Sequence, residues 1–342
     1  MQKKMMLTRV LAVAVTGAVL AASATSCHHK KDDETEEYLT GTLAFDLPSF
    51  MESGTSLELI PSGVTDNDGN IPGIYWTTSQ DVSQKDTTRR EGDPVSVKGT
   101  YILDVPSDFY GDITITCYAY ADGYYLRTQS AKTTVINREN SLKITGLEDT
   151  DPMFTDARDG RQYRYITLGG LDWMAANLAY SGGFPAYGTE FTRSIFGSFF
   201  TWDGAVSACP DGWRLPGNTE WKSLSDALGG TSSSELAPFK GIAGALMADA
   251  YFNDDRMWAF NTTVRLTATS GFNALPLGYA NVDSGACDFH DSGLYGVFWT
   301  ADELNERLAY YRYLYVSDTD MNIATGDKSA FSANVRCVRD AI

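Results

Sequence analysis

The residues of this chain that are best suited to chemistry are its five cysteines and three histidines. A serine or cysteine hydrolase needs a histidine base beside its nucleophile, and only His290 lies in a segment that we expect to fold. His290 stands between Phe289 and Asp291 in a predicted loop, which favours a polar surface role over a catalytic one. We therefore expect no nucleophilic catalysis.

Carboxylates and glycines give no firmer catalytic signal. Asp302 and Glu303 are neighbours of the kind that a glycosidase uses, but among 44 acidic residues such pairs arise by chance. The segment 66–70, DNDGN, clusters oxygen atoms, yet an EF-hand loop starting there would have Ile71 and Thr77 where Gly and Glu are required. A tight turn explains it better. No glycine run is followed by the Lys-Ser/Thr of a phosphate-binding loop, so we expect no enzyme, no metal and no cofactor.

The N-terminus predicts export. Three basic residues precede an apolar run at 10–22, which at about 13 residues is shorter than the roughly 20 that span a bilayer. Small residues then lead to Cys27. Residues 1–26 resemble a bacterial lipoprotein signal peptide, after which Cys27 would carry the lipid.

A charged tether follows at 27–38, beginning CHHKKDDETEE. It has almost no apolar residue to bury, so we expect it to be solvated, its two histidines included. The acidic run resembles the signal that directs Bacteroidetes lipoproteins to the cell surface. We therefore expect a protein anchored in the outer membrane through Cys27 and facing the cell exterior, with a periplasmic location as the alternative.

The charge of the chain excludes one class of partner. Its formal net charge is −17, and removal of the basic signal peptide makes the mature chain more acidic still. Without a basic surface to displace counterions from phosphates, nucleic acid is not an expected partner.

Two folded domains are predicted after the tether, and the first spans 39–147. Seven short alternating segments separated by turn residues predict an antiparallel β-sandwich of immunoglobulin-like type. In DITITCYAYA, alternation puts Cys117 on the apolar face, which predicts a buried free thiol. A polar linker is expected at 148–156.

The second domain, 157–342, mixes strands and helices. We expect a strand and a Gly169-Gly170 turn near its start, a short helix near Trp202, a clear helix over 218–228 with Asn218 or Thr219 as its cap, and late strands in GVFWTA, AYYRYLYV and ANVRCVRD. Between the second helix and these strands the chain is Gly-rich and predicted to be irregular.

Several ordered motifs of this domain carry a family resemblance. They are DGRQYRYITLGGLDWMAANL, FTWDGAVSACPDGWRLPGNTEW, FNALPLGY, GVFWTADE, AYYRYLYV and FSANVRCVRD. This pattern resembles the Fibrobacter succinogenes major paralogous domain family, which is similar in turn to formylglycine-generating-enzyme and C-type lectin-like folds. The resemblance implies an α+β C-type lectin-like domain over about 157–340, and hence a multidomain chain.

Disulfide pairing follows from the same resemblance. Cys209 and Cys337 match the two cysteine-bearing motifs of the family, so we expect them to pair, with Cys209 to Cys287 as the alternative. Formylglycine-generating enzymes use paired cysteines and copper, and oxidation of Cys337 would leave no thiolate for that chemistry. The lectin calcium triplets EPN, QPD and WND are absent from the sequence.

Recognition is therefore the expected role, and the predicted loop 278–296 is its expected place. Its candidate ligand-binding residues are Tyr279, Asn281, Asp283, Asp288 and His290. Tyr311, Tyr313 and Tyr315 alternate along a later strand, where either their face or the opposite one could be exposed. We expect a non-catalytic surface lipoprotein that binds a glycan or a protein; the alternatives are a structural or accessory subunit of a surface fibre or, less favoured, an enzyme of the formylglycine-generating type.

Replacing Cys27 tests the predicted anchor. The Cys27→Ala protein should move from the membrane fraction to the soluble fraction, because it lacks the acceptor for the lipid. Fractionation of cells expressing either form measures this. Retention of the variant in membranes would show that Cys27 is not the anchor, and loss of the intact parent protein from whole cells treated with protease would confirm surface exposure.

Overall fold

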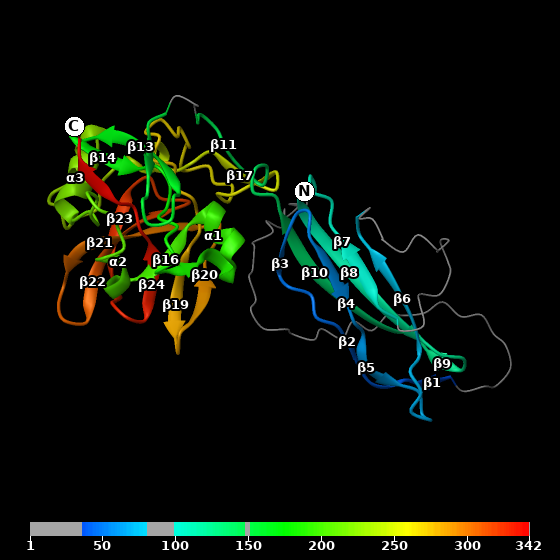
Figure 1. Ribbon diagram of the computed structural model, residues 1–342. Helices are drawn as coiled ribbons and strands as arrows, with labels where there is room; N and C mark the ends of the chain where they lie inside the picture. Colours follow the sequence, from blue (N-terminus) through cyan, green and yellow to red (C-terminus); the bar gives the residue numbers. More distant parts are fainter. Residues whose placement is uncertain (1–35, 81–98, 148–150, 342) are drawn as a thin grey trace, which may run out of the picture. The chain divides into compact units, whose positions relative to one another are not determined.

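A computed structural model describes residues 36–80, 99–147 and 151–341. The chain forms two compact units that divide between Ser141 and Leu142, and both are rich in β-strands (Figure 1). The predicted signal peptide, Cys27 and most of the tether lie outside the described residues. The longest helix within the described residues has ten residues, so none there can span a bilayer.

The N-terminal unit consists of short strands. They are β1 (Glu37–Tyr38), β2 (Thr40–Ala44), β3 (Phe50–Glu52), β4 (Ser56–Leu59), β5 (Ser62–Thr65), β6 (Gly73–Thr78), β7 (Tyr101–Asp104), β8 (Gly111–Tyr120), β9 (Tyr124–Tyr125) and β10 (Arg127–Ile136). A four-stranded sheet has the order β3-β10-β8-β6, and the pairs β1-β9, β2-β5 and β4-β7 complete the unit.

The core of this unit follows the alternation of β8. Ile113, Ile115 and Cys117 are fully buried on one face, where they meet residues from β4 and β7 such as Leu59 and Leu103. Cys117 is a free thiol, as predicted, and burial raises its pKa to about 12. The segment 66–70 is the predicted tight turn: Asp66 Oδ1 accepts the backbone N–H groups of Asp68 and Asn70.

The C-terminal unit contains every helix of the described residues and the largest sheet. Its strands are β11 (Leu142–Ile144), β12 (Met153–Thr155), β13 (Gln162–Leu168), β14 (Leu171–Met174), β15 (Phe184–Pro185), β16 (Ser198–Thr201), β17 (Ala250–Phe252), β18 (Asp255–Arg256), β19 (Tyr279–Asp283), β20 (Ala286–His290), β21 (Tyr295–Glu303), β22 (Leu308–Tyr315), β23 (Met321–Asp327), β24 (Phe331–Asn334) and β25 (Val338–Asp340). Its helices are η1 (Ala186–Gly188), α1 (Glu190–Phe196), α2 (Trp202–Ala205), α3 (Asn218–Ala227) and α4 (Ala243–Leu246).

Two segments before residue 157 pair with this unit. β11 lies in the last strand predicted for the first domain, yet it pairs antiparallel with β17. β12 lies in the predicted linker, yet it pairs with β13, and Phe154 packs against Trp213 at 5.1 Å between ring centroids. The strand at β11 was thus predicted but assigned to the wrong domain, and the polar residues around β12 concealed a strand; in both cases the pairing partner is distant in sequence.

A large sheet of the order β15-β16-β24-β21-β22-β23 forms the centre of the unit, and β19 pairs with β24 beside it. Its two faces support different cores. Phe298 and Leu314 point to a cluster that includes Trp221 of α3, whereas Val297 and Trp299 point to a cluster that includes Trp202 of α2. Since neighbouring residues of β21 serve opposite cores, its central part is buried on both faces.

Helix α3 confirms the predicted helix, but its cap differs. The N-cap is Gly217, whose backbone N–H donates to Glu220 at 2.6 Å, and Asp302 accepts the N–H of Asn218. Asn218 is unavailable for capping because its side-chain oxygen accepts hydrogen bonds from the buried guanidinium of Arg312.

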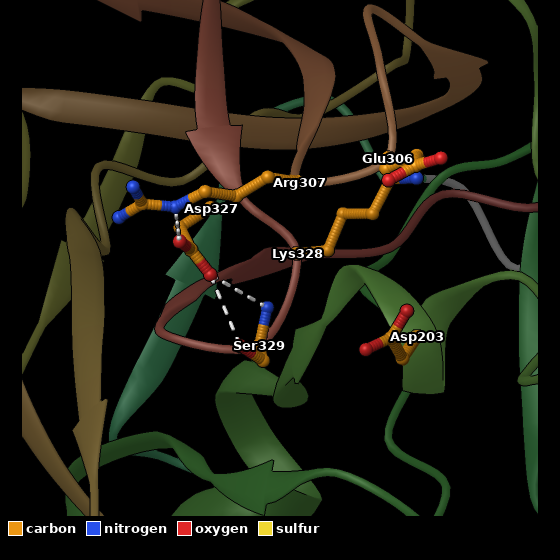
Figure 2. A pocket seen from close by; sticks show the side chains of 6 residues that line it. All are labelled: Asp203, Glu306, Arg307, Asp327, Lys328 and Ser329. Atoms are coloured by element: carbon orange, nitrogen blue, oxygen red, sulfur yellow. Dashed lines mark hydrogen bonds and ion pairs between the residues drawn. The ribbon is translucent and has the colours of Figure 1, made fainter.

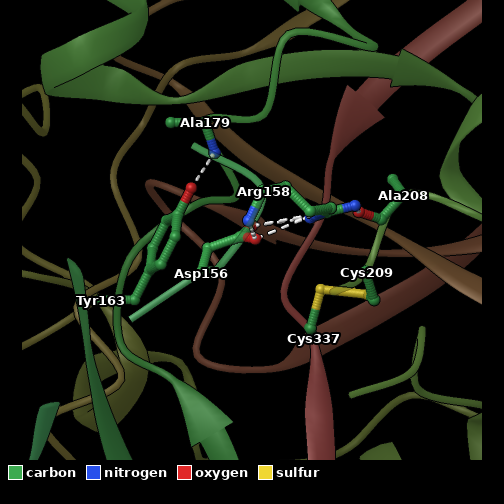
Figure 3. Close-up of a disulfide and its surroundings, with 7 residues drawn as sticks. All are labelled: Asp156, Arg158, Tyr163, Ala179, Ala208, Cys209 and Cys337. Carbon is green, nitrogen blue, oxygen red and sulfur yellow. Dashed lines mark hydrogen bonds and ion pairs between the residues drawn. A yellow bond between two sulfur atoms is a disulfide. The ribbon is translucent and has the colours of Figure 1, made fainter. Parts of the chain in front are cut away.

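Cys209 and Cys337 form the predicted disulfide (Figure 3). Beside it, Arg158 donates to the carbonyl of Ala208 at 2.8 Å and forms a two-pronged ion pair with the buried Asp156. Burial opposes the charge of Asp156, but hydrogen bonds from Arg158 keep the pKa of this carboxyl below its usual value. The disulfide, the start of the domain and the terminal strand are thus held together at one point.

Removing the disulfide should strongly destabilise the C-terminal unit. The bond closes a loop across a sequence separation of 128 residues, which is worth about 5 kcal/mol in the chain-entropy account. We expect the Cys209→Ala/Cys337→Ala protein to lose about that much free energy of unfolding in urea, followed by tryptophan fluorescence. Six of the seven tryptophans lie in this unit, so the signal reports on it. Cys287→Ala is the matched control; equal stability of the double variant and this control would contradict the prediction.

Candidate functional site

The predicted recognition loop is a β-hairpin. β19 and β20 pair antiparallel, and positive φ angles at Ser284 and Gly285 form the tight turn between them. The prediction of an irregular segment at 278–296 was wrong, because Gly and Asp residues outweighed the short alternation of apolar and polar residues on either side of the turn. Gly278 begins the hairpin at φ +75°, where an added Cβ would overlap the carbonyl oxygen of His290.

The hairpin register brings the candidate residues together. Tyr279 lies opposite His290, and Asn281 lies opposite Asp288, so these side chains share one face with Asp283. The other face is anchored: Ala280 is fully buried, and Phe289 packs against Phe199 at 5.2 Å between ring centroids. A rigid strand pair thus presents all five candidates to one side.

Tyr279 also begins a continuous row of aromatic rings across the large sheet. It stacks on Phe331 at 5.3 Å, and Phe331 stacks on Tyr311 at 4.8 Å. From there the row continues through Tyr313 to Tyr295, with ring centroids 6.0 and 5.9 Å apart. These rings come from four strands, β19, β24, β22 and β21, and each is half-buried.

Tyr315 extends the row beyond Tyr295, at 4.6 Å between ring centroids. We call the surface formed by the five tyrosines and Phe331 the tyrosine face; the five are Tyr279, Tyr295, Tyr311, Tyr313 and Tyr315. The sequence left open whether the alternating tyrosines of β22 point to the core. They lie on the more accessible side, because Arg312 and Leu314 fill the core on the other.

The phenol groups of the tyrosine face affect one another. Burial, together with smaller contributions from the neighbouring Tyr313, Tyr279 and Tyr295, raises the pKa of Tyr311 to about 12. The pKa values of Tyr279 and Tyr295 are likewise raised by burial, with Asp291 adding to the effect. The phenols therefore stay protonated at physiological pH and can both donate and accept hydrogen bonds.

His290 lies at the edge of this surface. Its Nε2 is 3.0 Å from Nδ2 of Asn281 and 3.3 Å from Oδ2 of Asp288, and its ring centroid is 5.4 Å from that of Tyr279. Amide, carboxylate and imidazole thus meet beside an aromatic ring. Such a set can hydrogen-bond a polyhydroxylated or peptide ligand while the ring contacts its apolar surface.

Sequence reasoning missed three members of the site: Tyr295, Asp291 and Phe331. Each was visible in a recognised segment, but the ring row needs strands that are distant in sequence, because β24 pairs with both β19 and β21. The two-residue spacing of Tyr295, Val297 and Trp299 could have shown that these three side chains share one face of a strand. It could not show that Tyr295 lies beside Tyr315.

The carboxylates considered for catalysis have other partners. Asp302 accepts from the first turn of α3, and Glu303 pairs with Lys328. Within the described ranges, no group of three or more Cys, His, Asp or Glu side chains is arranged to hold a metal ion. Cys209 and Cys337 are joined, so neither offers a thiolate for copper.

A depression of about 370 Å³ lies elsewhere in the unit (Figure 2). Its lining residues are Asp203, Glu306, Arg307, Asp327, Lys328 and Ser329. Arg307 donates to Asp327 at 2.6 Å, and with Ser329 it lowers the pKa of this carboxyl to about 2. Lys328 lies over the ring of Trp202 at 4.6 Å. The charged side chains of this depression thus pair with neighbouring side chains, which favours a structural role for them over ligand binding.

Comparison with known proteins bears on the domain that carries this surface. The family model of the Fibrobacter succinogenes major domain matches residues 166–339. The chain belongs to this family. The comparison with curated proteins finds no match. The family match includes the hairpin, every ring of the tyrosine face and both disulfide cysteines, so the surface belongs to the Fibrobacter succinogenes major domain itself.

The two free cysteines of the described part should be unreactive. Burial raises the pKa of both Cys117 and Cys287 to about 12, so each thiol stays protonated far above the usual cysteine range near 8.5. In a Cys27→Ser protein, iodoacetamide should label neither residue at pH 8 and both after unfolding in urea. Peptide mass spectrometry measures the labelling. Labelling of Cys287 that rises with a midpoint near pH 8.5 would contradict the prediction.

Proposed function

We propose that this chain is a lipid-anchored protein of the outer cell surface whose Fibrobacter succinogenes major domain is a non-catalytic, lectin-like recognition module. In this proposal the N-terminal unit is an immunoglobulin-like stalk. The sequence supports the anchor through Cys27 and the charged tether after it. Two separate β-rich units support a division between a spacer and a binding domain.

One observation carries the recognition role. The tyrosine face and the polar side of the hairpin lie next to each other, so half-buried rings adjoin an exposed amide and exposed carboxylates. Tyrosines supply large and rigid contact area at low entropic cost and keep a polar hydroxyl at the surface. The hairpin adds Asn281, Asp288 and His290 as orienting groups. A glycan is the ligand that uses both properties, because sugar rings have apolar faces and many hydroxyls.

Removing two hydroxyls tests this role. Tyr295→Phe/Tyr313→Phe keeps the rings and should preserve the fold, while each lost hydrogen bond weakens binding by about 1 kcal/mol. We expect affinity for the best ligand on a glycan array to fall about tenfold to thirtyfold, measured by calorimetry. Tyr310→Phe, on the opposite face of β22, is the matched control and should bind as the parent protein does.

The same experiment separates recognition of glycans from assembly. Absence of any glycan signal, together with a stoichiometric protein partner recovered from intact cells, would reject glycan recognition and favour an accessory subunit of a surface fibre. Unchanged affinity for the glycan in the Tyr295→Phe/Tyr313→Phe protein would show that the ligand binds elsewhere than on the tyrosine face.

A further inference from the structure

The charges that act on the tyrosine face are acidic. Asp291 raises the pKa values of Tyr279 and Tyr295, and Asp318 raises that of Tyr313. On the adjoining hairpin, Asp283 and Asp288 are exposed on the ligand-facing side. Carboxylates therefore lie beside the rings, both on the hairpin and near Tyr313.

Basic side chains lie over other rings. In the part of the chain that the structure describes, guanidinium or ammonium groups contact rings outside the tyrosine face, such as Tyr165, Tyr180 and Phe239. Among the residues that the structure describes, no such cation lies over a ring of the tyrosine face. A ligand with carboxylates or sulfates would be repelled by the carboxylates beside the rings, because charges closer than a Debye length of about 8 Å are not fully screened.

The acidic groups are themselves engaged by polar partners. Asp288 lies 3.3 Å from His290, Asp283 accepts from Ser284 at 3.1 Å, and Asp318 accepts from Asn322 at 2.9 Å. The phenol groups of Tyr295, Tyr311 and Tyr313 are half-buried and neutral, because burial raises their pKa values. Hydroxyls, more than free charges, are thus what this surface offers to a ligand.

These observations set the charge of the ligand. We propose that the tyrosine face binds an uncharged glycan chain, one without carboxylate or sulfate groups. The phenols and the hairpin amide hydrogen-bond its hydroxyls, and the acidic groups exclude anionic polysaccharides. This inference rests on the proposed recognition function and narrows it to one class of ligand.

Affinity electrophoresis of the full mature chain tests the charge rule. The gels contain one of five polymers, namely mannan, dextran, heparin, polygalacturonate or polylysine, at 20 and 300 mM salt. We expect retention by at least one neutral polymer, with a dissociation constant that changes less than twofold between the two salt concentrations. Heparin and polygalacturonate should cause no retention at either. Tyr295→Phe/Tyr313→Phe should weaken neutral retention at least tenfold, and Tyr310→Phe should not.

The outcomes distinguish this inference from the proposed function. Retention by heparin or polygalacturonate that Tyr295→Phe/Tyr313→Phe abolishes would overturn the charge rule and leave glycan recognition standing. Retention by polylysine alone, lost in the same variant, would make the ligand a basic peptide and overturn both. No retention by any polymer would likewise reject glycan recognition. Asp283→Asn/Asp288→Asn provides a second check, because removing both negative charges should produce measurable retention by polygalacturonate, and its absence would contradict the charge rule.

Discussion

The C-terminal unit depends on a guanidinium that is buried without a carboxylate among its hydrogen-bond partners. Arg336 donates to the side-chain oxygen of Asn177 and to the backbone carbonyls of Met174, Phe272 and Asn273, at distances of 2.7 to 3.0 Å. Burial lowers its pKa to about 9, so it remains charged at neutral pH, and four oxygen acceptors and the ring of Phe272 replace its hydration. Three segments that are distant in sequence must therefore converge on Arg336, because without any one of them a buried N–H of the charged guanidinium would lack an acceptor.

The neighbour of Arg336 in sequence adds a covalent constraint at the same place. Cys337 joins Cys209, and Arg158 binds the carbonyl of Ala208 beside that bond. The terminal strand is thus fixed by charge, by the disulfide and by pairing of β25 with β14. Because these contacts stabilise the unit here, the large sheet can tolerate half-buried rings on part of one face.

The sequence predicted the elements whose signals are local. The helix at 218–228, the strands around Gly169-Gly170, the late strands and the family-implied disulfide could all be recognised from short motifs, and the structure contains each. Elements whose partners are far away in sequence were harder to predict. The strand β19 pairs with β24 about fifty residues later, and β11 pairs with β17 more than a hundred residues later, so neither could be placed from local composition. The five candidate residues share one face only because the hairpin register places Asp288 opposite Asn281 and His290 opposite Tyr279, which no sequence period could show.

Arg312 shows why the exposed side of β22 could not be predicted. Hydropathy alone would turn an arginine toward solvent and the alternating tyrosines toward the core. In the structure Arg312 is fully buried, because Asn218 and two backbone carbonyls accept its hydrogen bonds and it lies 3.8 Å from the ring of Phe239. The tyrosines are only half-buried and pack against the other core cluster. Since side chains alternate along a strand, burying Arg312 commits Tyr311 and Tyr313 to the other face. The tyrosine face is therefore a consequence of the polar core. Asn218, in the ACPDGWRLPGNTEW segment of the family domain, accepts hydrogen bonds from Arg312, and the burial of Arg312 places the tyrosines on the opposite face of β22.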